Sequence, residues 1–219
     1  MCLCGLSTGG WEGLVAGVVG CYTPDRVTLV GVDGVDGSGK TTFADELARR
    51  LREQGHQVER VRLDDYLAPR AVRHARGRHS PEGFYLDSYD LEAFRREVLT
   101  PLRTDGWYRP VWFSLADDAP VDEPRRYAAP GTLVIVDGMF LHRAELRDAW
   151  DHSVFLDVPF AETFRRMAIR DGCPADPDDP RNARYVEGQR LYLRTDEPTR
   201  RASAVVDNTD PTQPVLIRG

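Results

Sequence analysis

A glycine-rich octapeptide, GVDGSGKT at residues 34–41, constrains the fold of this chain more than any other feature. It matches the pattern G-x-x-x-x-G-K-[ST] at every fixed position. The run VTLVGV at residues 27–32 precedes it and predicts a buried strand. The residues that follow place Phe43, Leu47 and Leu51 on one face of an amphipathic helix. A strand, a glycine-rich turn and a helix in this order predict a phosphate-binding loop.

The residue types of this loop suit a nucleotide triphosphate and magnesium. Glycines let backbone N–H groups approach phosphate oxygens, and a helix N-terminus adds partial positive charge. Lys40 can reach the β- and γ-phosphates, and the Thr41 hydroxyl can bind Mg²⁺. We therefore predict ATP or GTP and Mg²⁺ as cofactors. The residues predicted to bind the nucleotide are Gly34, Asp36, Gly37, Ser38, Gly39, Lys40, Thr41 and Thr42.

Apolar runs and amphipathic segments alternate along the rest of the chain. Further strands are expected at residues 58–63, 133–136, 154–156 and 204–206, and further helices at residues 91–102, 160–170 and 184–194. This alternation predicts an α/β fold. More specifically, we expect a three-layer P-loop NTPase fold with a mostly parallel central sheet and a helical lid. One kinase-like domain is expected over residues 25–219, with its lid at about residues 165–190.

The first two dozen residues differ in composition from the rest. Residues 1–22 are rich in glycine and small apolar residues and contain no Lys or Arg. The apolar run at residues 14–19 is too short to span a bilayer. We therefore expect a flexible leader over residues 1–24, whose deletion would leave the activity and the melting temperature nearly unchanged.

Charge and cysteine content exclude several classes of partner. The 219 residues carry a net charge of −6, which opposes binding to the phosphates of duplex nucleic acid. The four cysteines form no C-x-x-C pair, and the histidines lack metal-ligand spacing, so we expect no zinc site and a reduced, cytoplasmic protein. No nucleic-acid or membrane partner is expected, and a homo-oligomer is left open.

Acidic residues follow two of the expected strands. Phosphoryl transfer to an alcohol needs a carboxylate that accepts the hydroxyl proton, and Asp64 or Asp65 can supply it at the end of one strand. Asp137 ends another strand, where an acidic residue commonly holds Mg²⁺. The alternative for each of these residues is an ordinary polar turn at the end of a strand.

Arginines and aromatic residues complete the set of candidates. Arg166 and Arg170 share one face of the helix expected at residues 160–170 and can stabilise the charge of a transferring phosphoryl group. The alternative for that helix is a solvated face whose arginines pair with neighbouring acids. Tyr66, Tyr85 and Trp112 belong to an aromatic group that can contact a substrate or pack in the core.

An ordered series of segments resembles the uridine/cytidine kinase family. It comprises GVDGSGKTT at residues 34–42, LDDY at 63–66, SPEGFYLDSYDLEAF at 80–94, VIVDGMFLHRAELRDAWD at 134–151, VFLDVPFAETFRRMAIRD at 154–171, GQRLYL at 188–193 and VVDNTD at 205–210. The resemblance spans residues 27–210 and looks closest to the uridine-kinase-like proteins of high-GC bacteria. It implies Mg²⁺-assisted transfer of a phosphoryl group from ATP or GTP to a nucleoside 5′-hydroxyl.

The resemblance also implies roles for individual residues. Asp64 becomes the general base, Asp87 the sugar contact and Trp112 the stacking partner of the base. The predicted catalytic residues are Lys40, Asp64, Arg166 and Arg170. The predicted metal site consists of Thr41 and Asp137. The residues predicted to bind the substrate are Asp64, Tyr66, Tyr85, Asp87, Trp112 and Arg170.

Two departures from the family pattern leave the acceptor open. The acidic residue expected after the stacking aromatic is replaced by Phe113 and Ser114, and a base-recognising histidine has no counterpart. The alternatives are therefore a kinase of another small alcohol, such as pantothenate, nicotinamide riboside, a sugar phosphate or a specialised metabolite. A nucleotide-binding regulatory switch is a further alternative, although the chain has no Asn-Lys-x-Asp segment.

Overall fold

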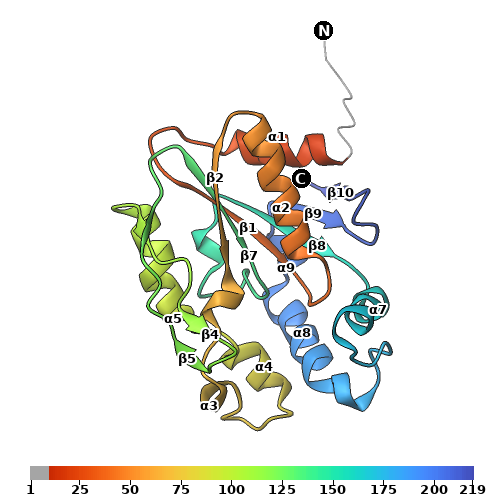
Figure 1. Cartoon of the computed structure of the whole chain (residues 1–219). Coiled ribbons are helices and arrows are strands. Elements are labelled where there is room, and N and C mark those ends of the chain that lie inside the picture. The colour runs from red at the N-terminus through yellow and green to blue at the C-terminus, as the bar shows by residue number, and fades with distance from the viewer. Residues whose placement is uncertain (1–9) are drawn as a thin grey trace.

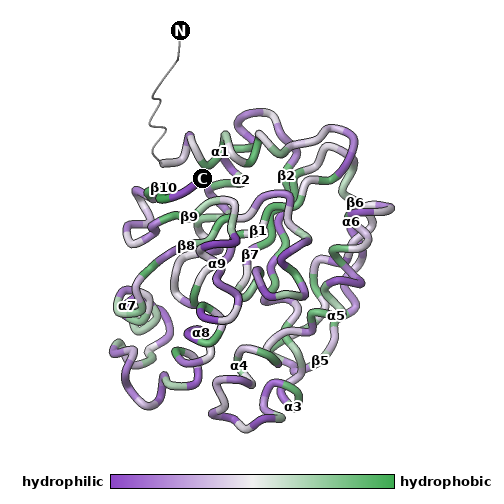
Figure 2. Tube along the Cα trace, turned by 180° about the vertical axis from the view of Figure 1, so that it is seen from behind, coloured by the Kyte–Doolittle hydropathy of each residue, from purple (hydrophilic) through white to green (hydrophobic). Residues whose placement is uncertain are grey.

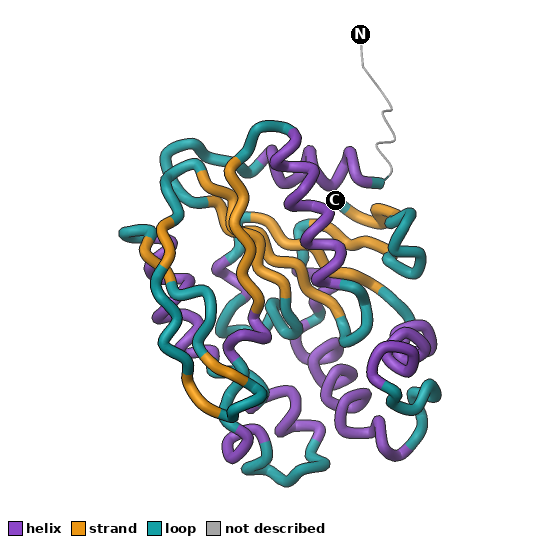
Figure 3. Tube along the Cα trace, viewed as in Figure 1, coloured by secondary structure: helices purple, strands orange, loops and turns teal. Residues whose placement is uncertain are grey.

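A six-stranded sheet forms the middle layer of the molecule (Figures 1 and 3). The structure is a computed structural model and describes residues 10–219. The strand order is β10-β9-β8-β1-β7-β2, with five parallel strands and β10 antiparallel to β9. The strands are β1 (Thr28–Gly34), β2 (Gln57–Arg62), β7 (Thr132–Asp137), β8 (His152–Asp157), β9 (Ala204–Asp207) and β10 (Val215–Arg218).

Every residue of β1 and β7 is buried, because both strands lie inside the sheet and carry near-continuous apolar runs. Alternate side chains point to opposite faces, so Leu29 and Val30 belong to two different core clusters. Figure 2 shows the apolar residues concentrated on these central strands. The predicted three-layer α/β fold with a mostly parallel sheet is confirmed.

Helices cover both faces of the sheet. One face packs against α1 (Trp11–Gly20) and α2 (Lys40–Glu53). The other packs against a group that includes α4, α5 and α8. The remaining helical segments are η1 (Leu63–Tyr66), α3 (Arg70–Arg73), α4 (Pro81–Asp87), α5 (Leu91–Phe94), η2 (Arg95–Leu99), α6 (Thr100–Arg103), η3 (Arg147–Ala149), α7 (Phe160–Asp171), η4 (Pro180–Asn182), α8 (Ala183–Asp196) and α9 (Pro198–Arg201).

The proline-rich segment between α6 and β7 is more ordered than the sequence indicates. It forms two short antiparallel pairs of strands, which lie apart from the main sheet. The pairs are β3 (Trp107–Tyr108) with β6 (Arg126–Tyr127) and β4 (Phe113–Ser114) with β5 (Ala119–Pro120). Within residues 10–219, no helix has both the length and the apolar character needed to span a membrane.

The expected flexible leader is wrong over residues 11–20, which form helix α1. Leu14, Val15 and Val18 are spaced as one face of a helix, and all three are buried in the core cluster that contains α2. Trp11 stacks on Phe43 of α2 with ring centroids 4.7 Å apart. The glycine content concealed this apolar face. The expectation for residues 1–9 lies outside the described residues.

The packing of α1 leads to a prediction opposite to the one drawn from the sequence. Leu14→Ala removes a side chain that is 2% exposed, and should lower the free energy of unfolding by about 2–4 kcal/mol. Denaturant unfolding of purified protein measures this change. Glu12→Gln, on the exposed side of the same helix, is the control and should change the free energy by less than about 0.5 kcal/mol. If Leu14→Ala and the unchanged protein were equally stable, α1 would contribute nothing to the core, and the expectation of a flexible leader would stand.

Candidate active site

The phosphate-binding loop connects β1 to α2 in a conformation that needs glycine. Gly37 and Gly39 have φ values of 74° and 88°, in the left-handed region that other residues rarely adopt. A Cβ atom on Gly37 would also lie 2.6 Å from the carbonyl oxygen of Thr163 in α7. The loop therefore rests directly on α7, and the last turn before α2 leaves the helix N-terminus open toward the pocket.

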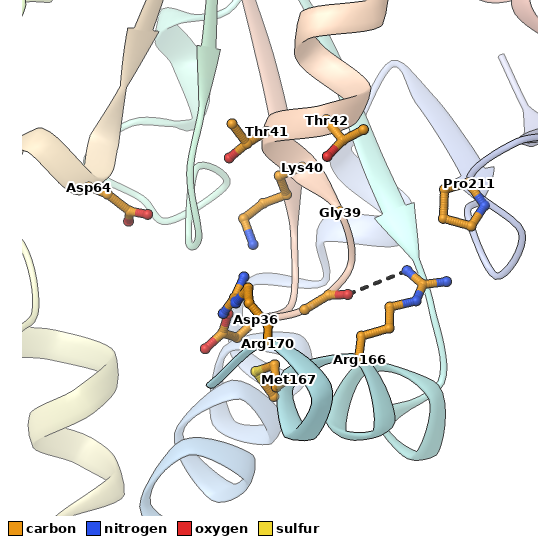
Figure 4. Close-up of a pocket in the computed structure, with 11 residues that line it drawn as sticks. Asp36, Gly39, Lys40, Thr41, Thr42, Asp64, Arg166, Met167, Arg170 and Pro211 are labelled. Carbon is orange, nitrogen blue, oxygen red and sulfur yellow. Dashed lines mark hydrogen bonds and ion pairs between the residues drawn. The ribbon is translucent and has the colours of Figure 1, made fainter. Parts of the chain in front are cut away.

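A pocket of about 390 Å³ lies over this loop (Figure 4). Its lining comes from the loop, the start of α2, the segment after β2, helix α7 and the loop after β9. The lining residues are Asp36, Gly37, Gly39, Lys40, Thr41, Thr42, Asp64, Arg166, Met167, Arg170 and Pro211. Of the residues predicted to bind the nucleotide, Gly34 and Ser38 are absent from this lining. Both belong to the loop itself and lie close together, since a Cβ atom on Gly34 would be 2.6 Å from the Ser38 Oγ.

Lys40 points into the middle of the pocket, with Asp64 on one side and Arg166 on the other (Figure 4). Its Nζ donates a hydrogen bond to the Val35 carbonyl oxygen at 2.9 Å. The ammonium group is therefore held above the loop by main chain and not by a carboxylate. This arrangement leaves its charge available to an anion.

Thr41 and Asp137 are brought together at the end of β7. The Thr41 hydroxyl donates to Asp137 Oδ2 at 2.7 Å, and the guanidinium of Arg60 donates to Asp137 Oδ1 at 2.5 Å. Asp137 is only 3% exposed, so the cation of Arg60 offsets the cost of burying its charge. Nothing in the sequence indicated Arg60, which lies on β2 and reaches Asp137 through the pairing of β2 with β7.

A hydroxyl and a carboxylate side by side are oxygen donors of the kind that Mg²⁺ prefers. Among residues 10–219 there is no group of three or more His, Cys, Asp or Glu side chains that could hold a metal ion. A magnesium ion at Thr41 and Asp137 would therefore take its remaining ligands from phosphate oxygens and water, as is usual for this ion at nucleotide sites. The residues present fit such an ion.

Asp64 and Asp65 have different environments, although they are adjacent. Asp64 is exposed, lines the pocket and accepts a hydrogen bond at 2.9 Å from the hydroxyl of the buried Tyr89. Asp65 is half-buried and does not line the pocket, and burial raises its pKa. The main chain of Asp65 is fixed by a hydrogen bond of 3.1 Å from the Trp112 N–H. The geometry thus places Asp64 at the pocket, with Tyr89 to orient it.

All three arginines of α7 pair with a neighbouring acid, as the alternative of a solvated helix face predicts. Two of them also line the pocket. Arg165 points away and pairs with Glu162, as a solvated helix face would. Arg166 lines the pocket, and its guanidinium donates to the carbonyl oxygens of Asn208 at 3.0 Å and Gly37 at 3.4 Å (Figure 4). Arg170 also lines the pocket, where its guanidinium pairs with Asp171 at 2.6 Å and lies 3.8 Å from the Asp36 carboxylate.

The structure places two predicted substrate-binding residues in the core, which corrects their predicted role. Tyr66 is fully buried, and its hydroxyl donates to the Arg109 carbonyl oxygen. Tyr85 is 8% exposed, and its hydroxyl donates to Asp196 at 2.5 Å. Both phenol groups therefore satisfy buried acceptors and do not face the pocket. Their packing is the one that the alternative of core packing predicts.

Asp87 and Trp112 lie outside the pocket lining as well. Asp87, at the end of α4, pairs with Arg76 at 2.9 Å. Trp112 is partly buried beside the main core cluster, and the Arg96 guanidinium lies 5.2 Å from its ring centroid. The hydrogen bond from Trp112 to Asp65 keeps it next to the segment that carries Asp64.

Helix α8 holds the start of the phosphate-binding loop, a contact that sequence reasoning missed. Gln189 accepts a hydrogen bond of 2.6 Å from the Asp36 N–H, and the Tyr192 hydroxyl donates to the fully buried carboxylate of Asp33. The same carboxylate contacts His142 Nδ1 at 2.6 Å and accepts from the Gly34 N–H at 2.7 Å. Gln189 and Tyr192 belong to the segment GQRLYL, so the only available signal was its resemblance to the family.

Comparison with known proteins agrees with this geometry. A family model described as an AAA domain matches residues 30–191, which is most of the chain. A uridine kinase of Leuconostoc citreum is 28% identical over 81% of this chain and 85% of its own length. Human nicotinamide riboside kinase 1 is 28% identical over 77% of this chain and 76% of its own length.

Comparison with solved structures identifies similar kinases. A possible uridine kinase from Bacillus stearothermophilus superposes with a TM-score of 0.69 and 28% identity, covering 89% of this chain and 95% of that one. Phosphoribulokinase from Rhodobacter spheroides shares the fold, with a TM-score of 0.55 and 15% identity over 84% of this chain and 71% of that one. The predicted resemblance to uridine-kinase-like proteins is confirmed, and the names of these relatives support the predicted phosphotransferase class. The chain belongs to the AAA domain family, and it is similar to uridine kinases in both sequence and structure.

Proposed function

We propose that this chain is an ATP-dependent kinase that transfers the γ-phosphoryl group to the 5′-hydroxyl of a pyrimidine nucleoside. One observation carries the proposal. A single pocket joins the phosphate-binding loop, the exposed carboxylate of Asp64 and two arginines of α7, although these lie far apart in the sequence. A protein that only binds nucleotide does not need the carboxylate opposite the loop, whereas a kinase needs a proton acceptor there.

The donor phosphates would lie over the loop. Backbone N–H groups of the loop and the N-terminus of α2 favour phosphate oxygens, and Lys40 neutralises charge near the terminal phosphate. Thr41 and Asp137 would hold Mg²⁺. When bound there, the ion would supply positive charge that reduces the mutual repulsion of the phosphate oxygens. The ion pair of Arg60 with Asp137 holds that carboxylate in place beside Thr41.

The transfer step follows from the positions of Asp64 and the arginines. The acceptor hydroxyl donates to Asp64, its oxygen bonds to the γ-phosphorus, and the bond to the β-phosphate oxygen breaks. The proton moves to the Asp64 carboxylate, which Tyr89 orients. Lys40, Arg166 and Arg170 stabilise the charge on the phosphoryl oxygens during transfer.

The nucleoside acceptor is supported by the relatives. Uridine and nicotinamide riboside, the compounds in their names, are both ribosides. Trp112 lies beside the segment of Asp64 and offers an aromatic surface to a base, and Asp87 can accept from sugar hydroxyls if Arg76 releases it. Nicotinamide riboside is the second candidate acceptor, because a relative of similar identity acts on it by name.

A panel of alcohols tests the proposed acceptor. We expect uridine and cytidine to raise the rate of ADP formation from Mg·ATP far above the rate with water, with the 5′-monophosphate identified by mass spectrometry. 5′-Deoxyuridine is the control, since it keeps the base and ribose but lacks the attacking hydroxyl. Turnover with another alcohol alone would keep the kinase and change its substrate. No stimulation by uridine, cytidine, nicotinamide riboside, pantothenate or a sugar phosphate would favour a regulatory switch.

Exchange of the proposed base separates Asp64 from its neighbour. Asp64→Asn keeps the shape and the contact with Tyr89 but cannot accept the proton, so kcat should fall by about 10²- to 10⁴-fold while the affinity for Mg·ATP is retained. Asp65→Asn is the matched control and should lose much less activity, because Asp65 does not line the pocket. Steady-state kinetics with calorimetric titration of nucleotide measure both effects. The reverse order of losses would assign the base to Asp65.

A further inference from the structure

A second pocket adjoins the one over the phosphate-binding loop. Its volume is about 290 Å³, and it shares Gly39, Thr42 and Pro211 with the first pocket. The N-terminal helix α1, the exposed side of α2 and the loop after β9 form its walls. The remaining lining residues are Trp11, Phe43, Glu46, Arg50, Asn208 and Thr212.

The proposed function, on which this inference rests, sets the direction of the donor nucleotide. Asp64 and Pro211 lie at opposite ends of the first pocket, with Lys40 between them (Figure 4). The γ-phosphate must face Asp64, and the loop N–H groups hold the phosphates nearer to the nucleoside. The nucleoside therefore leaves the first pocket beyond Thr42 and Pro211, where the second pocket begins.

The sizes of the two pockets support this path. Small-molecule pockets span about 300–1,000 Å³, and the first pocket, at about 390 Å³, is near the lower limit. It must hold a triphosphate together with the acceptor hydroxyl. The adjoining space, of about 290 Å³, offers additional room for a nucleoside.

Trp11 gives this space an aromatic wall. Its ring stacks on Phe43 with an interplanar angle of 27°, and the Arg50 guanidinium lies 4.8 Å from its centroid. Arg50 is in turn paired with Glu46 at 2.7 Å. A partly exposed indole that is fixed in this way, beside a carboxylate and a guanidinium, suits a flat base with polar edges.

We propose that Trp11 contacts the purine nucleoside of the donor nucleotide, so that helix α1 completes the donor site. The helix is anchored for this role by the buried Leu14, Val15 and Val18. Trp11 thereby determines affinity for the nucleoside part of the donor and leaves the affinity for its phosphates unchanged.

Calorimetric titration of the full chain with two magnesium complexes, ATP and inorganic tripolyphosphate, tests the proposal. Trp11→Leu should raise the Kd for Mg·ATP by about tenfold and leave the Kd for Mg·tripolyphosphate unchanged. Trp11→Phe should lie between this variant and the unchanged protein. Trp107→Leu is the control, because Trp107 is 49% exposed on β3 and lines neither pocket. Mg·ATP should also alter the tryptophan fluorescence of the unchanged protein and of Trp107→Leu, but not of Trp11→Leu.

The outcomes separate this inference from the proposed function. Equal weakening of both ligands in Trp11→Leu would mean that the loop is disturbed, and would overturn the contact with the nucleoside. Unchanged affinity for Mg·ATP would overturn it as well, while the proposed kinase activity would stand. Failure of the unchanged protein to bind Mg·ATP would overturn both. Melting temperatures of all variants show whether each one is folded.

Discussion

The contact between Gly37 and helix α7 sets the position of both walls of the main pocket. Because a Cβ on Gly37 would lie 2.6 Å from the Thr163 carbonyl oxygen, only glycine lets the loop lie this close to the helix. The same closeness brings Arg166 and Arg170, one and two turns from the point of contact, to the edge of the loop. The arginines therefore reach the loop through a backbone contact, and the pocket depends on it.

Helix α8 also holds the start of the loop. Gln189 binds the N–H of Asp36, and Tyr192 binds the carboxylate of Asp33 just before the loop. Asp33 is fully buried, and its charge is compensated by hydrogen bonds from Tyr192, His142 and the Gly34 N–H. His142 also contacts Ser153 Oγ at 3.0 Å, so the loop, the segment after β7 and strand β8 share one buried polar network. A loop fixed in this way needs little rearrangement to bind phosphate.

The sequence was sufficient for the parts of the fold that are determined locally. The apolar runs of β1 and β7 and the amphipathic pattern of α2 follow from residue order alone, and parallel strands with intervening helices then predict the sheet. The positions of Lys40, Thr41 and Asp64 follow from the same reasoning. Lys40 and Thr41 end the glycine-rich motif that follows one recognisable strand, and Asp64 comes at the end of another. Helix α1 was missed because its glycines outweighed the helical spacing of Leu14 and Val18.

The contacts that position the site could not be derived in this way. Asp36 and Gln189 are 153 residues apart, Asp33 and His142 are 109 apart, and Arg60 and Asp137 are 77 apart. No local pattern specifies such pairs, since they depend on how whole elements pack. Tyr66 and Tyr85 show a second limit of prediction from sequence. The sequence around an aromatic residue is the same whether its side chain faces a ligand or the core.

The central claim is that Lys40 and the loop hold a magnesium-bound triphosphate. Titration calorimetry of the unchanged protein and of Lys40→Ala with a non-hydrolysable ATP analogue and Mg²⁺ tests it most directly. We predict saturable binding of one nucleotide per chain, and a loss of at least about tenfold in affinity when the ammonium group is removed. Absence of binding to the unchanged protein, or equal affinity of the two proteins, would contradict the account.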